Sequence, residues 1–138
     1  MTWVVDSSVA VKWFVAEQDH QRALRILGVP DDRVAPDILI YEVCNIFWRK
    51  LRQGEVSRDQ AEASIGELLR GDVAFWPGED LALRAFEISQ DLQHPVYDCF
   101  YIACAEASDG ILVTADQRLL KQLHASRFGH LGCHVADV

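Results

Sequence analysis

Four acidic residues in this sequence stand next to or inside apolar segments, where an ionised carboxylate is costly to bury. These residues are Asp6, Glu42, Asp98 and Asp116. Asp6 and Asp116 each follow a short apolar run, whereas Asp98 and Glu42 lie within apolar segments. Lone carboxylates in such surroundings are rarely left unpaired, because desolvating the charge costs free energy. The four positions are therefore the first candidates for chemistry.

If these carboxylates are gathered into one site, they need a cation. Several carboxylates within about 4 to 6 Å of one another cannot all stay ionised, because mutual repulsion raises their pKa values. Mg²⁺ or Mn²⁺ removes this conflict, since hard ions prefer oxygen ligands and leave positions for water and phosphate. A metal held by Asp6 and Asp98 would activate water for attack on a phosphodiester. Glu42 or Asp116 would orient that water, and no histidine is placed in the sequence to act as general base.

Each acid also has a structural interpretation. The three aspartates are placed where a side chain can cap a helix or lie in its first turn. Glu42 lies well past the first turn of its expected helix, so a buried ion pair with Arg49 is its alternative. Asn45, one turn beyond Glu42, extends the same polar stripe and is expected to support the site. The chemical interpretation is favoured because it explains all four acids together.

Strand-like and helix-like segments alternate along the chain. Apolar and β-branched runs predict strands over residues 2–5, 33–35, 73–76, 111–114 and 133–135. Amphipathic spacing predicts helices over residues 7–15, 23–27, 37–53, 57–70, 81–92 and 117–125, and one that begins near Tyr97. This alternation predicts an α/β fold whose parallel sheet is covered by helices on both faces. In such sheets ligands bind at the carboxyl ends of the strands, where Asp6 and Asp116 are expected.

Two of the predicted helices carry recognisable start and stop signals. Asp37 is expected to cap the helix 37–53, and Gly54 to end it. Ser57 is expected to cap the next helix, with Gln60 in the position that completes a capping box.

Length and composition indicate one globular domain spanning residues 1–138. Half the residues are apolar and a quarter are charged, as in soluble globular proteins. No apolar run approaches the ~20 residues that span a bilayer, and the N-terminus lacks the pattern of a signal peptide. We therefore expect a cytoplasmic protein that does not enter a membrane. The cysteines form no CxxC pattern and are expected to be free, mostly buried thiols.

The chain is acidic, with 21 Asp and Glu against 13 Lys and Arg. This excess argues against broad adhesion to a phosphate backbone. An RNA substrate would instead depend on bound metal and on local basic residues, for which the candidates are Lys12, Arg49, Arg118 and Lys121. A basic protein partner would also be favoured.

Four segments together carry a family resemblance. They read VDSSV at 5–9, YEVCN at 41–45, YDCFYIACA at 97–105 and VTAD at 113–116. In order and spacing, over nearly the whole chain, they resemble PIN-domain nucleases, especially the VapC-like toxins of type II toxin–antitoxin systems. The resemblance implies a three-layer α/β/α sandwich, Mg²⁺- or Mn²⁺-dependent cleavage of RNA, a homodimer and inhibition by a cognate antitoxin.

By position, the resemblance makes Asp6, Glu42, Asp98 and Asp116 the acidic quartet that holds the metal. Ser8, beside the first acid, and Thr114, before the last one, are implied to support the site through hydrogen bonds. Aromatic pairs lie at Trp13, Phe14, Phe47 and Trp48. Core packing explains most of them, whereas an exposed one would suit a groove for an antitoxin helix.

Other chemistries fit the sequence less well. His130, Cys133 and His134, with Cys104 or His124, match no zinc-finger spacing. Cys99 beside Asp98 suggests a thiol nucleophile, but a buried hydrophobic role is the usual one.

Metal-dependent phosphatases and phosphotransfer proteins also place an aspartate after the first strand. A phosphatase of the haloacid dehalogenase type wants a second Asp where this chain has Ser8, and a response-regulator receiver wants a Lys where it has Asp116. A catalytically silent PIN-fold binding module remains the non-enzymatic alternative.

Overall fold

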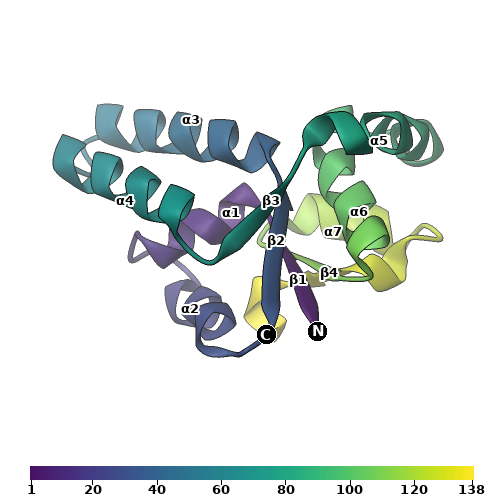
Figure 1. The fold of residues 1–138 in the computed structure, drawn as a ribbon, viewed down its shortest axis with the longest axis horizontal. Helices are drawn as coiled ribbons and strands as arrows, with labels where there is room; N and C mark the ends of the chain where they lie inside the picture. Colours follow the sequence, from purple (N-terminus) through teal and green to yellow (C-terminus); the bar gives the residue numbers. More distant parts are fainter.

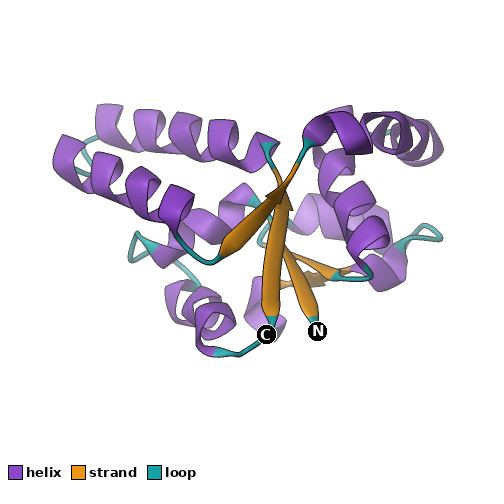
Figure 2. Cartoon of the chain, viewed as in Figure 1, coloured by secondary structure: helices purple, strands orange, loops and turns teal.

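A five-stranded sheet forms the centre of the computed structural model, which describes residues 1–138 (Figures 1 and 2). Its strands are β1 (Thr2–Val5), β2 (Asp32–Pro36), β3 (Val73–Trp76), β4 (Ile111–Thr114) and β5 (Gly132–His134). The strand order is β3-β2-β1-β4-β5, and every neighbouring pair is parallel. The predicted, mainly parallel sheet is therefore confirmed, and it contains no antiparallel pair.

Seven α-helices cover the sheet. They are α1 (Ser7–Ala10), α2 (His20–Gly28), α3 (Ile38–Arg52), α4 (Arg58–Arg70), α5 (Gly78–Leu92), α6 (Val96–Ser108) and α7 (Gln117–His124). Helices α1 to α4 lie on one side of the sheet and α5 to α7 on the other, as the left and right halves of Figure 1 show. Right-handed crossovers require this division, because the chain moves outward from β1 to β3 and then returns to β4 and β5. The three-layer α/β/α prediction is confirmed.

The core is continuous through the three layers. It contains 35 buried hydrophobic residues, and β1 contributes Val4 and Val5, both fully buried. Strands that helices cover on both faces are expected to be apolar without alternation, as β1 and β4 are. Helix α6 packs against β1, β2 and β4, and α5 packs along α6.

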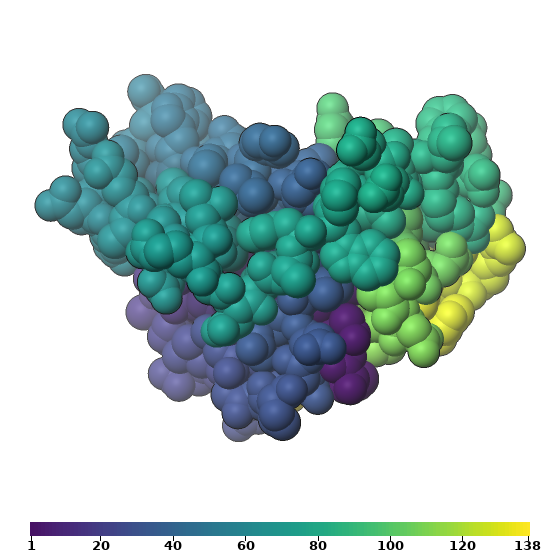
Figure 3. All heavy atoms as spheres, in the orientation of Figure 1, coloured from purple at the N-terminus to yellow at the C-terminus, as the bar shows by residue number.

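Helices α3 and α4 form a hairpin that extends beyond the sheet (Figure 1). Gly54 follows α3 with φ of +74°, a left-handed conformation in which glycine ends many helices. In Figure 3 this hairpin and α5 form two raised lobes, with a notch between them at the upper edge. Strands β1, β2 and β3 point toward that edge, so their carboxyl ends lie on the side of the notch (Figure 1).

Three local predictions were wrong. The expected helix 7–15 is a single α-turn followed by a 3-10 turn at Val11–Trp13. Asp37 does not cap α3 with its side chain; its Oδ1 instead accepts from the amide of Gly78, 3.1 Å away, at the start of α5. Ser57 caps α4 as predicted, but Gln60 donates its amide to Phe14 O rather than completing the capping box. The side chains of Asp37 and Gln60 each form a hydrogen bond with a residue distant in sequence instead.

All four cysteines are free, with Cys99 and Cys104 buried, Cys133 partly buried and Cys44 exposed. None of the helices combines the length and the apolar character that a membrane crossing requires.

Candidate acidic active site

Asp6 lies where β1 ends and α1 begins, at the centre of the sheet. Its Oδ1 accepts from the Ser8 hydroxyl at 2.6 Å and from the Val9 amide at 3.2 Å, so it caps α1. The Thr114 hydroxyl lies near enough to lower the pKa of the Asp6 carboxyl, because β1 and β4 are adjacent and Val5 pairs with Val113. The residue is 8% exposed. Asp6 is therefore both a helix cap and a buried acid at the switch point of the sheet.

Burial raises the pKa of the Asp6 carboxyl to about 6, against the lowering effect of its hydrogen bonds from Ser8, Thr114 and Val9. The charge of Asp98 raises the same pKa further. No lysine or arginine forms an ion pair with Asp6. The negative charge at this position is therefore uncompensated in the protein alone.

Glu42 projects from α3 toward α6. The Tyr101 hydroxyl donates to its Oε1, and the nearby Ser7 hydroxyl lowers the pKa of its carboxyl. Burial raises the pKa of Glu42 above its usual value, and the charge of Asp98 contributes in the same direction. The alternative prediction, a buried pair with Arg49, is wrong, since the partner of Glu42 is a phenol from another helix.

Asp98 lies in the first turn of α6 and is coupled electrostatically to both Asp6 and Glu42. Its Oδ2 lies 2.6 Å from Nε2 of His94, four residues earlier. The sequence placed no histidine to act as general base, and sequence reasoning missed that His94 bonds one of the acids. The four-residue spacing was the available signal, but Pro95 between the two residues suggested that they belonged to separate elements.

Asp116 caps α7. Its Oδ1 accepts from the amides of Arg118 at 3.0 Å and Leu119 at 3.1 Å. The Thr114 hydroxyl oxygen accepts from the Asp116 amide at 3.0 Å, which fixes the strand-to-helix turn. Asp116 shares a pocket with Asp98, whereas Asp98 is the acid whose charge acts on Asp6 and Glu42.

The hydroxyl residues singled out in the sequence join these segments. Besides donating to Asp6, the Ser8 oxygen accepts from the Ala115 amide at 3.0 Å, so it joins α1 to the end of β4. Asn45 is exposed and forms no hydrogen bond to any of the acids. Sequence reasoning missed Ser7 and Tyr101, although Tyr101 lies one helical turn after Asp98 and therefore on the same side of α6.

An open pocket of about 760 Å³ lies beside the buried acids. Its lining includes His94, Asp98, Asp116, Arg118 and Lys121. Arg118 and Lys121 are exposed, and neither forms an ion pair. The pocket therefore presents two unpaired basic side chains beside the carboxylates of Asp98 and Asp116. A phosphate group and a cation can both be accommodated by such a lining.

The chemistry of the acids fits a hard divalent ion. Asp6, Glu42 and Asp98 offer oxygen donors with no basic residue bound to the first two, and the raised pKa values show that the charges are under-compensated. No three acidic, histidine or cysteine side chains converge as a complete metal site. Mg²⁺ typically takes one or two protein carboxylates and keeps water or phosphate as its other ligands, so partial convergence is sufficient.

The structure does not support the alternative sites that were weighed from the sequence, a zinc site and a thiol nucleophile. The residues His130, Cys133 and His134 do not form a metal-binding group. Burial raises the pKa of the Cys99 thiol to about 11, which makes it a poor nucleophile at neutral pH. Lys12 is buried and its Nζ lies 3.3 Å from Glu17 Oε1, so it does not line an RNA path.

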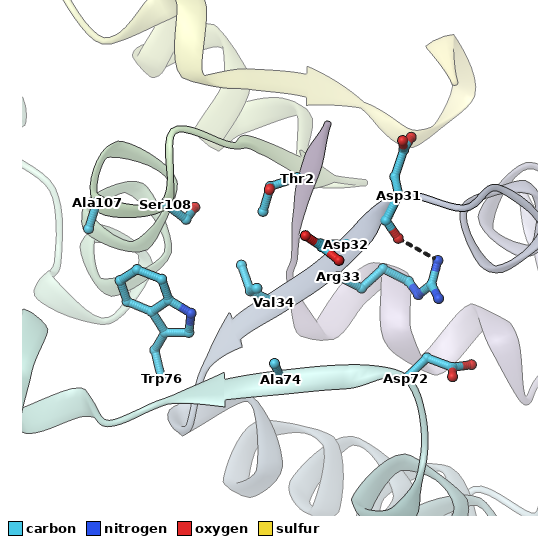
Figure 4. Close-up of a pocket in the computed structure, with 10 residues that line it drawn as sticks. All are labelled: Thr2, Asp31, Asp32, Arg33, Val34, Asp72, Ala74, Trp76, Ala107 and Ser108. Carbon is cyan, nitrogen blue, oxygen red and sulfur yellow. Dashed lines mark hydrogen bonds between the residues drawn. The ribbon is translucent and has the colours of Figure 1, made fainter.

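A second open hollow, of about 540 Å³, lies at the amino ends of the strands (Figure 4). Three acids border it, Asp31, Asp32 and Asp72, and Figure 4 shows them spread around its rim. Arg33 is occupied by backbone carbonyls, among them Asp31 O at 3.1 Å. The hollow contains none of the predicted site residues, and ligands of parallel sheets bind at the opposite, carboxyl ends.

Together the parallel sheet and the buried acids at its switch point define an α/β protein with an acidic site at the carboxyl ends of β1 and β4, the edge at which parallel sheets of this kind bind ligands. The chain belongs to the PIN-domain family, whose model matches residues 3–124.

A curated relative, ribonuclease VapC3 from Pyrobaculum aerophilum, is 29% identical over 127 residues, which are 91% of this chain and 97% of the relative. VapBC2 from Rickettsia felis, solved bound to a DNA fragment from their promoter, matches with a TM-score of 0.68 at 11% identity, over 97% of this chain and 98% of that one. A toxin–antitoxin complex from Klebsiella pneumoniae matches with a TM-score of 0.58 at 16% identity, over 83% of this chain and 87% of that one. At such identities the two structures show a shared fold.

Proposed function

We propose that this protein is a metal-dependent endoribonuclease and the toxin of a toxin–antitoxin pair. The observation that carries the proposal is the group of Asp6, Glu42 and Asp98: burial and the charge of Asp98 raise the pKa values of Asp6 and Glu42, and no lysine or arginine forms an ion pair with either. The family and the relative named as a ribonuclease support it. We further propose that residues 1–138 act as one nuclease domain.

In this proposal Mg²⁺ or Mn²⁺ is held by Asp6 and Asp98, with Glu42 and Asp116 as the remaining members of the acidic quartet. When bound, the ion lowers the pKa of water and stabilises the charge that develops on the phosphodiester oxygens. The protein's own residues orient the acids: the Ser8 hydroxyl donates to Asp6, and the Thr114 hydroxyl accepts from the Asp116 amide.

Glu42 is suited to accept a proton from the attacking water. Its raised pKa lies nearer to neutral pH than that of an ordinary glutamate, which favours a general base, and the Tyr101 hydroxyl holds the carboxylate in place. We propose Asp116 as the outermost acid, since its Oδ1 is engaged in capping α7.

RNA would be recognised locally rather than by overall charge. The formal net charge is −8, so general attraction to a polyanion is unfavourable. Arg118 and Lys121, unpaired on the wall of the pocket beside Asp98, are positioned to contact backbone phosphates. We expect replacement of either residue to weaken RNA binding and to reduce its dependence on salt.

We propose that the antitoxin occupies the groove between α3 and α4. Phe47, Trp48, Leu51 and Ile65 line this groove, and Trp48 is 56% exposed. An amphipathic helix buries its apolar face in such a groove. If a gene immediately upstream encodes a small protein, co-purification of that protein should be lost in Trp48→Ala; retention would place the antitoxin elsewhere.

We also propose a homodimer formed through α5 and α6. Leu83 is 83% exposed and Phe86 59% exposed on α5, and Tyr97 is 63% exposed at the start of the adjoining α6. Apolar side chains gathered in this way favour a partner surface. Sedimentation of Phe86→Glu should then give a monomer where the unaltered protein gives a dimer.

The nuclease proposal is tested by cleavage of RNA with Mg²⁺ or Mn²⁺, with EDTA, and with Asp6→Asn or Asp98→Asn. EDTA and each substitution should abolish cleavage, whereas Asp59→Asn, the same charge change at an exposed position on α4, should not. Cleavage that survives both site substitutions refutes the mechanism. A phosphatase would hydrolyse phosphomonoesters and spare RNA, and a silent module would bind its partner without turnover.

A further inference from the structure

A chain of three hydrogen bonds connects α7 to Asp98. The side-chain amide of Gln122, on α7, donates from Nε2 to the carbonyl oxygen of Leu92 at 2.7 Å. Its Oε1 lies 2.6 Å from Nδ1 of His94, and Nε2 of His94 lies 2.6 Å from Oδ2 of Asp98. Both links to the histidine are short, and the three bonds together join α5, α6 and α7.

The first link determines where the histidine carries its proton. A backbone carbonyl only accepts, so the Gln122 group that faces Leu92 must be the NH₂. The oxygen of the same amide therefore faces His94, and an amide oxygen also only accepts. Nδ1 of His94 must carry a proton in this arrangement.

The second link occupies one oxygen of the acid. The contact between His94 Nε2 and Asp98 Oδ2 is 2.6 Å long, which is a short hydrogen bond. Asp98 Oδ2 is thus committed to His94, while its Oδ1 forms no hydrogen bond with the protein.

The backbone around His94 is constrained as well. Gln93 ends α5 in a left-handed conformation with φ of 52°, and Pro95, with its restricted φ, precedes α6. The imidazole is only 17% exposed. The backbone of His94 is therefore restrained by its neighbours, and its ring is restrained by two hydrogen bonds. A turn residue that faces solvent requires neither restraint.

We propose that His94, oriented by Gln122, is a positioning residue that fixes Asp98 by one oxygen and leaves the other for the metal ion. This inference rests on the proposed function, because it assumes that Asp98 holds an ion. Gln122 forms no hydrogen bond with Asp98, so its effect on the ion is expected to pass through His94. Partners of metal-binding carboxylates and histidines typically contribute about 10- to 100-fold to affinity or activity.

The test combines single and double substitutions. His94→Ala, Gln122→Ala and the double variant are compared with His94→Gln, whose amide keeps a donor near the Nε2 position. Gln117→Ala, an exposed amide on the same helix without a hydrogen bond, is the matched control. Mn²⁺ affinity is measured without RNA by electron paramagnetic resonance of the free ion, kcat and KM are measured on RNA, and thermal unfolding verifies folding.

We expect both alanine variants to weaken Mn²⁺ binding by about tenfold or more and to lower kcat similarly, with KM for RNA within about twofold. The double variant should be no worse than His94→Ala, because the two residues act in series. His94→Gln should recover part of the loss, and Gln117→Ala should match the unaltered protein. If His94→Ala does not fold, Gln122→Ala carries the test.

Two results would overturn the inference alone. The first is an active protein in which both alanine variants keep full Mn²⁺ affinity and kcat. The second is a double variant whose losses multiply, which would show independent roles. An unaltered protein that neither binds Mn²⁺ nor cleaves RNA would instead refute the proposed function, and this inference with it.

Discussion

Replacing Asp6 by Asn should stabilise the metal-free protein while it abolishes cleavage. Asn preserves the cap on α1, because its oxygen accepts from the Ser8 hydroxyl and the Val9 amide as the carboxylate does. It also removes a charge that burial disfavours and that Asp98 repels. The substitution therefore separates the structural role of this side chain from its charge.

The magnitude follows from the pKa. In the folded protein the pKa of Asp6 is raised from 3.8 to about 6. Because the folded value is raised, ionisation of Asp6 lowers the free energy of unfolding. This loss is absent below pH 3.8 and grows as the pH rises to about 6. A shift of about two units corresponds to about 3 kcal/mol, so Asp6→Asn should be more stable by about that amount at pH 8.

Urea unfolding in EDTA at pH 4 and pH 8 measures the effect. With a slope of about 1.5 kcal/mol per molar urea, the midpoint should rise by about 2 M at pH 8. At pH 4 the gain should fall below about 1 kcal/mol, since folded Asp6 is then protonated. Saturating Mg²⁺ should narrow the gap at pH 8, because the ion stabilises only the unaltered site. A variant that is less stable at pH 8, or a gain independent of pH, would refute the reasoning.

Three further substitutions probe the residues around the acids. Ser8→Ala leaves the Ala115 amide without its acceptor and should cost about 1 to 3 kcal/mol in urea unfolding, a loss that Ser8→Thr should reduce. Tyr101→Phe removes the donor to Glu42; it should lower kcat by about tenfold with a stability change of about 1 kcal/mol, and an unchanged kcat would count against Glu42 as the base. Asp116→Ala should cost about 1 kcal/mol through the lost cap, whereas Asp116→Asn should unfold like the unaltered protein. Asp116→Asn should also retain more cleavage than Asp98→Asn, and equal losses would make Asp116 a full member of the metal site.

The sheet was predictable because its strands are short apolar or β-branched runs. A strand that helices cover on both faces requires such residues. Predicted strand ends agree with the structure within a residue or two, as for 111–114 and for 73–76. The helix 7–15 was mispredicted because its apolar spacing is the same in an α-helix and in the 3-10 turn that replaces its second half. Apolar periodicity reports which side is buried and does not determine the hydrogen-bonding pattern.

The acids of the site were predictable, whereas their partners were not. A carboxylate among apolar residues is conspicuous in the sequence, as with Glu42. Its partner Tyr101 is 59 residues away, in a segment whose tyrosine is equally well explained by packing. Gln122 lies 28 residues from His94 and has no feature that distinguishes it from a solvent-exposed helical glutamine. Such pairs are created by the packing of α3, α6 and α7, which one sequence does not reveal.

The choice between a helix cap and a catalytic acid, which the sequence presented for each aspartate, is a false alternative. A carboxylate has two oxygens, and one is sufficient to cap a helix or to bond a neighbour. Asp116 uses Oδ1 for both amide bonds to α7, and Asp98 uses Oδ2 for His94. In each case the other oxygen forms no hydrogen bond with the protein. A hydrogen bond from the protein to one oxygen therefore orients the other oxygen toward a ligand. The helix cap in this way contributes to the geometry of the site.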